Sequence, residues 1–168
     1  LCNFTNAKLQ GAQMVRSHLA DCDFSDANLE NLLLEGAQID KTKFQRANLR
    51  GVNLRGSEML SPEFSHADLR ESNLSLISCI ESNFDDADLR EAYFTGSELS
   101  FCSFSQAQLT KTRFTRAVLG RCNFSQAKLK YTVFPGAYFY ETIWTNGKKL
   151  GTGFVSAPKN RTVHLPRG

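Results

Sequence analysis

Three histidines and a cluster of carboxylates are the side chains of this 168-residue chain best suited to acid–base or metal chemistry. His18, His66 and His164 lie far apart and do not follow the spacing of metal ligands. The carboxylates Asp85, Asp86 and Asp88 recur in a regular outward pattern that is typical of solvated surface charge. The sequence contains no phosphate-binding loop, dinucleotide-binding motif or nucleophile elbow. We therefore expect no enzyme, small-molecule substrate, cofactor or metal site.

The apolar residues that would have to position any such site recur with a period of five. Every fifth residue from Phe4 to Trp144 is apolar, and 28 of these 29 residues are Leu, Ile, Met, Phe or Trp, the exception being Cys79. The residue two positions earlier is Ala, Ser, Thr or Cys in 25 of the 29 units. Residues five apart on an α-helix are separated by about 140°, so this pattern forms no buried helical stripe. It instead predicts extended segments that bend every five residues, with both marked residues inside.

A second period of twenty indicates how many bends complete one turn. Phenylalanine recurs every twenty residues from Phe4 to Phe124, and Trp144 ends the column. Twenty residues are four units, so each coil is expected to have four sides. About seven coils would stack at the strand spacing of about 4.8 Å, with the small residues leaving room for large neighbours.

The units resemble those of the pentapeptide-repeat family, whose usual motif is Ala-(Asp/Asn)-Leu-x-x. Matching units include Ala27-Asn28-Leu29, Ala47-Asn48-Leu49, Ala67-Asp68-Leu69 and Ala87-Asp88-Leu89. The resemblance implies an all-β fold, a right-handed quadrilateral parallel β-helix over residues 1–145, followed by a tail at 146–168. Leu32, Val52 and Ile77 are large for the small position and Pro62 lacks an amide, so we expect local distortion in these coils.

The net charge of +3 conceals a difference between the repeat and the tail. Five basic residues and no acidic one follow residue 145, so the repeat carries a net charge of −2. We expect the tail to cap the last coil or to be partly disordered. The sequence shows no signal peptide and no apolar run long enough to span a membrane.

Five cysteines favour a reducing compartment over a disulfide framework, and we expect a cytoplasmic protein. Cys2 and Cys22 lie one coil apart, as do Cys102 and Cys122, so each pair is expected to stack inside the coil. The chain begins within the repeat, so a secreted effector or an organelle lumen stays open.

Three outward groups are candidate surfaces. Arg50, Arg70 and Arg90 would form one column, either paired with neighbouring carboxylates or free to bind an acidic partner. A second group is apolar where the pattern elsewhere is polar, and either binds a protein or is shielded by its neighbours; it comprises Leu33, Leu60, Leu76, Ile80 and Phe101. At the C-terminal end, Tyr138, Tyr140 and Trp144 would either close the coil or form an end-to-end homodimer.

These observations favour a non-enzymatic scaffold that binds another protein, and nucleic acid is not expected because carboxylates interrupt the arginines. One alternative is implied by the resemblance, since some pentapeptide-repeat proteins mimic DNA and bind DNA gyrase against quinolone drugs. The nearly neutral repeat disfavours that alternative. Another alternative is a targeting or interaction domain of a larger protein, such as a secreted effector.

Overall fold

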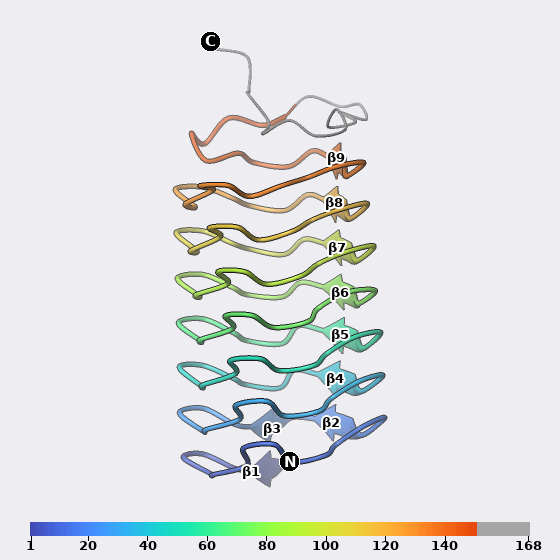
Figure 1. Ribbon diagram of the computed structural model, residues 1–168, viewed down its shortest axis with the longest axis vertical. Coiled ribbons are helices and arrows are strands. Elements are labelled where there is room, and N and C mark those ends of the chain that lie inside the picture. Colours follow the sequence, from blue (N-terminus) through green and yellow to red (C-terminus); the bar gives the residue numbers. More distant parts are fainter. Residues whose placement is uncertain (151–168) are drawn as a thin grey trace.

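A computed structural model describes residues 1–150 of the chain. The backbone winds into a stack of four-sided coils around one long axis (Figure 1), with about seven turns of about twenty residues. Each extended segment pairs in parallel with the segment twenty residues later, as Leu60 does with Ile80. The four-sided coil predicted from the two periods and the parallel β-helix implied by the resemblance are confirmed.

One side of the coil is a continuous parallel sheet. Its seven strands follow one another in the order β2 (His18–Ala20), β4 (Gln38–Asp40), β5 (Glu58–Leu60), β6 (Ser78–Ile80), β7 (Glu98–Ser100), β8 (Val118–Gly120) and β9 (Tyr138–Tyr140). A separate two-stranded sheet joins β1 (Cys2–Asn3) to β3 (Cys22–Asp23). We refer to the outer surface of the seven-stranded sheet as the β2–β9 face.

The other sides are held by single parallel bridges, such as Asn48 to Asp68. The outward Asn or Asp at many of these bridges accepts a hydrogen bond from the N–H two residues later. Asn48 accepts from Arg50 N at 3.2 Å, and Asp68 accepts from Arg70 N at 3.2 Å. This local bond satisfies a corner amide, and explains why Asn and Asp precede leucine in the repeat. Within residues 1–150, no hydrogen bond of this kind involves the outward side chains of β4 to β8, so folding does not give them this role.

The corners depend on left-handed backbone. From Asn6 to Glu141, every fifth residue has a positive φ: 22 of these residues are not glycine, and six are. None of them is Val, Ile or Thr, the side chains for which this conformation is most costly. The residue two positions after each large apolar residue from Phe4 to Phe139 is therefore also restricted, because its side chain must tolerate a positive φ.

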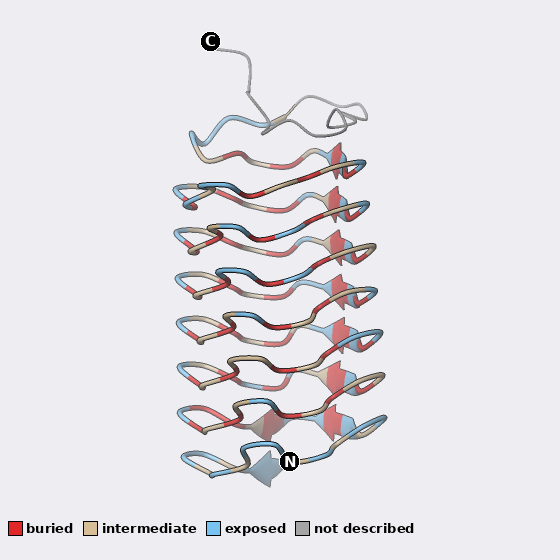
Figure 2. Ribbon diagram, viewed as in Figure 1, coloured by how far each residue is buried: buried red, intermediate tan, exposed pale blue. Residues whose placement is uncertain are grey.

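Buried residues recur from coil to coil (Figure 2), and their side chains form one hydrophobic core cluster. Rings of the phenylalanine column stack with centroids 4.7 to 5.3 Å apart from Phe4 to Phe124. Phe94 meets Phe84 edge to face at 6.0 Å, so two aromatic columns lock together in the C-terminal half.

The distortion expected at Leu32 and Val52 is not found. Both side chains are fully buried, and the N–H of each donates to the carbonyl three residues earlier at 3.0 Å, as alanine does in other coils. Pro62 also fits without disruption, because the equivalent N–H groups of Thr42 and Ser82 make no hydrogen bond. At three of the four corners of each coil, the residue in the small position makes this same bond to the carbonyl three residues earlier. Within residues 1–150, Ile77 is the exception at these corners, so the expected distortion is confined to its corner.

The last described residues fold back over the final coil. Lys149 pairs with Ile143 in an antiparallel bridge, and Leu150 N donates to Thr142 O at 2.8 Å. Residues 146–150 of the predicted tail thus cover the end of the repeat. The rest of the tail, with His164, lies outside the described residues. No helix within residues 1–150 has the length and apolarity needed to cross a membrane.

Candidate functional site

Leu60 and Ile80 form an exposed apolar pair at the centre of the β2–β9 face. They lie directly opposite each other in β5 and β6, with 44% and 42% of their surface exposed. They line a shallow groove of about 460 Å³, together with the polar side chains of β4 to β6. The polar lining residues are Gln38, Asp40, Glu58 and Ser78.

Apolar surface continues towards the C-terminal end of the same face. Phe101, at the corner after β7, is 51% exposed, and Arg121 stacks on its ring at 5.2 Å. The same guanidinium lies 5.5 Å from the Tyr140 ring and forms an ion pair with Glu141 at 2.6 Å. Val118 and Tyr138 are also exposed on this face.

Val118 was not among the residues predicted from the sequence, and Tyr138 and Tyr140 were predicted in a different group. The twenty-residue spacing could have identified Val118 and Tyr138, because it places them in one outward column with three earlier residues of this face. That column comprises Glu58, Ser78, Glu98, Val118 and Tyr138. Two other predicted members do not join the groove. Leu76 is exposed at the opposite corner of the sheet, and Leu33 is only half-exposed, in a bridge with Asn53 on the adjoining side.

The carboxylates on this face lack basic partners. Within residues 1–150, no ion pair involves Asp40, Glu58 or Glu98, and Glu81 has only a hydrogen bond from Ser61 Oγ at 3.3 Å. One oxygen of Asp40 is buried without a hydrogen-bond partner. No lysine or arginine occurs in β5, β6 or β7, but Lys41 follows β4 at the edge of the groove. With Asp40 and Glu58 in the lining, the groove and this margin keep a net negative charge.

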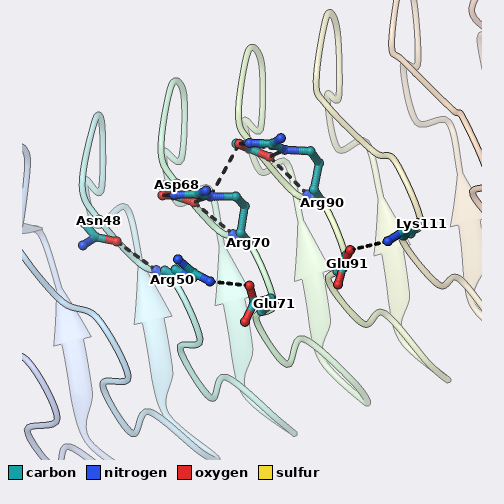
Figure 3. A network of polar contacts seen from close by, with 9 residues as sticks. Asn48, Arg50, Asp68, Arg70, Glu71, Arg90, Glu91 and Lys111 are labelled. Carbon is teal, nitrogen blue, oxygen red and sulfur yellow. Dashed lines mark hydrogen bonds and ion pairs between the residues drawn. The ribbon is translucent and has the colours of Figure 1, made fainter.

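The charges of the arginine column, unlike the carboxylates of the groove, are paired with charges of opposite sign (Figure 3). Arg70 binds Asp68 with two hydrogen bonds and lies 3.7 Å from Asp88, which also binds Arg90. Arg50 contacts Glu71 at 2.6 Å. Burial tends to raise the pKa of Asp68, but hydrogen bonds from Arg70 outweigh it and hold that pKa below its usual value. These arginines are therefore neutralised by their neighbours and do not present a free basic stripe.

The aromatic residues proposed for the C-terminal end lie in different places. Trp144 is 4% exposed and packs on Phe124, Phe134 and Phe139 inside the coil. Tyr138 and Tyr140 instead extend sideways from β9. Trp144 thus belongs to the core under residues 146–150, and the tyrosines extend the side face.

The potentially reactive side chains do not converge. No group of three His, Cys, Asp or Glu residues suited to a metal occurs in the described part. Asp85 accepts hydrogen bonds from Ser103 and Ser105, Asp88 binds arginine, and Asp86 is exposed. Cys22, Cys79, Cys102 and Cys122 are buried free thiols, and burial raises the pKa of Cys122.

Comparison with known proteins agrees with this geometry. The family model described as pentapeptide repeats matches in eight copies between residues 2 and 143. HetL, a pentapeptide repeat protein involved in heterocyst differentiation regulation from the cyanobacterium Nostoc sp. strain PCC 7120, is similar with a TM-score of 0.52. The two share 23% identity over 88% of this chain and 78% of HetL.

A trypsin-treated form of QnrB1, a plasmid-mediated fluoroquinolone resistance protein, is similar with a TM-score of 0.55. Its identity is 22% over 84% of this chain and 72% of QnrB1. No match was found among curated proteins. At these identities the structural similarity is one of fold.

Proposed function

The chain belongs to the pentapeptide repeat family, and we propose that it is a non-catalytic module that binds another protein through the β2–β9 face. The observation that carries this proposal is the exposed Leu60–Ile80 pair in its groove. Adjacent apolar side chains exposed together on a rigid sheet are typical of interaction surfaces.

The local structure of the face supports the same proposal. On the bridged sides, outward Asn and Asp residues hold corner amides, so their identity is constrained by folding. The outward residues of β5 and β6 make no such bond, and exposed leucine and isoleucine gain little from folding at these positions. A binding role accounts for apolar residues that the coil itself does not require.

The test is capture of partner proteins by chemical cross-linking, comparing the wild type with Leu60→Asp/Ile80→Asp. The matched control is Asn53→Asp/Asn73→Asp, which adds the same charge on an adjoining side and keeps the oxygens that bind Arg55 N and Ser75 N. We expect partners to be lost with the first variant and kept with the control. Unchanged capture by a folded Leu60→Asp/Ile80→Asp variant would show that this face is not the site.

Gyrase binding ranks below this proposal. The fold likeness to QnrB1 favours it, but the repeat has a net charge of only −2 and its acidic columns contain paired arginines. DNA mimicry requires a strongly negative surface. A DNA gyrase supercoiling assay with quinolone distinguishes the two proposals, because we expect no protection of gyrase from the drug at micromolar protein.

The five free cysteines support the cytoplasm as the proposed compartment.

A further inference from the structure

We propose that the β2–β9 face receives a basic amphipathic helix of the partner protein, lying along the axis of the coil. This inference rests on the proposed function and specifies the chemistry of the occupant. It is carried by the spacing of the apolar residues and by the unpaired carboxylates on either side of them.

The spacing of the apolar residues favours a helix. Leu60 and Ile80 occupy neighbouring parallel strands, so they repeat along the axis at about 4.8 Å. A helix laid along that axis repeats its buried stripe at about 5.4 Å, a mismatch of about 0.6 Å at each coil. An extended segment presents alternate side chains at roughly 6.7 Å and would lose register about three times faster.

The charges flank the apolar column on both of its sides. Glu58 precedes Leu60 by two residues in β5, and Glu98 holds the same position two coils later. Glu81 follows Ile80 on the opposite side of the column, where Lys41 lies two coils earlier as the one basic residue of that corner from β4 to β7. All three side chains belong to exposed residues, and none has an ion-pair partner within residues 1–150.

This arrangement matches an apolar stripe bordered by lysine or arginine. Docking of such a helix would place basic side chains beside Glu58, Glu81 and Glu98 while its apolar side chains enter the groove. Complementary charge of this kind speeds association and sets the orientation of the partner. An acidic helix, a nucleic acid or an anionic membrane surface would be repelled by the same carboxylates.

The experiment measures binding of a fluorescein-labelled synthetic helix of leucine and lysine by fluorescence anisotropy. Its leucines follow the i, i+3, i+4, i+7 pattern, and a second peptide of equal composition alternates leucine and lysine to form a strand. We expect the helical peptide to bind more tightly than the alternating one, with an affinity that falls as salt is added.

Two charge-neutralising variants locate the binding. We expect Glu58→Gln/Glu98→Gln to weaken binding of the helical peptide about tenfold, through loss of two ion pairs near an apolar surface. Glu30→Gln/Asp86→Asn removes two charges from other sides of the coil and should change affinity less than twofold.

Equal binding of the two peptides, or an unchanged affinity of Glu58→Gln/Glu98→Gln, would overturn the helix proposal. If Leu60→Asp/Ile80→Asp abolishes partner capture while the helical peptide does not bind, the proposed function stands and the helix proposal is wrong. If partner capture also survives that variant, both are wrong.

Discussion

Leu76 approaches Gly96 so closely that a Cβ atom added to Gly96 would lie 2.9 Å from Leu76 Cδ2. The two residues occupy the same corner column in successive coils, and both have positive φ, at +59° and +68°. Gly56 belongs to this column and also has a φ of +68°, but a Cβ added there would meet no atom within 4 Å. Substitution of Gly56 therefore tests the cost of a left-handed backbone alone, whereas substitution of Gly96 adds the cost of a steric clash.

We expect Gly56→Ala to lower the free energy of unfolding by about 1–2 kcal/mol, because alanine is disfavoured at positive φ. Gly96→Ala should cost more, since the Leu76 side chain must also move. The measurement is the midpoint of chemical denaturation for each variant. Equal losses would show that the leucine side chain moves away without cost.

Glycine introduced at a left-handed corner should have the opposite effect. His66 has a φ of +59° and an exposed side chain, so we expect His66→Gly to raise the denaturation midpoint, by about 0.5–1 kcal/mol of stability. Lys128, which forms a bridge with Gln108, is the control, and Lys128→Gly should lower the midpoint. If both substitutions are destabilising, the positive φ of His66 does not cost stability that glycine can restore.

Phe84 lies between two stacked rings of the aromatic column. Its ring stacks 4.9 Å from both Phe64 and Phe104, and the side chain is fully buried. We expect Phe84→Ala to cost about 3–5 kcal/mol through lost contacts and a cavity. Phe4 is partly buried and stacks only on Phe24 among the described rings, so Phe4→Ala should cost much less in the same denaturation experiment. Similar losses would show that stacking between coils contributes little.

Acid should weaken the arginine network. The pKa of Asp68 in the folded protein lies below its ordinary value of 3.8, so its stabilising contribution is complete above that value. The contribution is lost as the pH falls through the lower folded pKa. We expect the denaturation midpoint to fall as the pH drops below about 4.

Asp68→Asn provides the control for this pH dependence. The amide oxygen can still accept from Arg70 N, but the side chain no longer titrates. The variant should be less stable at pH 7 and should lose less stability on acidification. An identical pH profile in both proteins would show that Asp68 is not responsible.

The alternation of small and large residues was sufficient to predict the coil, because only a bend every five residues buries all 29 large positions. The exceptions were harder to interpret from sequence. Leu32 and Val52 fit because their turn bonds persist, and Pro62 fits because that position needs no amide donor. Which amides carry hydrogen bonds is a property of the folded backbone, so an apolar pattern cannot supply it.

The candidate site was predicted in part. Leu60, Ile80 and Phe101 lie on one face as their spacing indicated, whereas Leu33 and Leu76 lie elsewhere. The outward position of Arg50, Arg70 and Arg90 was also evident, but their partners were not. Ion pairs between coils depend on side-chain conformations. The residue types alone therefore do not decide whether the arginines are paired with carboxylates or available to a partner.

By itself, the sequence determined the architecture: the five-residue unit requires bends, and the twenty-residue columns require four sides and stacked coils. The tertiary structure alone decided which side became the continuous sheet. All four sides carry the same small-x-large unit, but the corner after Met59 lacks the turn bond that closes the other corners, apart from the one at Ile77. The chain therefore stays extended through Leu60, which pairs with Ile80 and projects into solvent. The missing turn bond thus keeps this segment extended, and the residue types at 60 and 80 make its centre apolar.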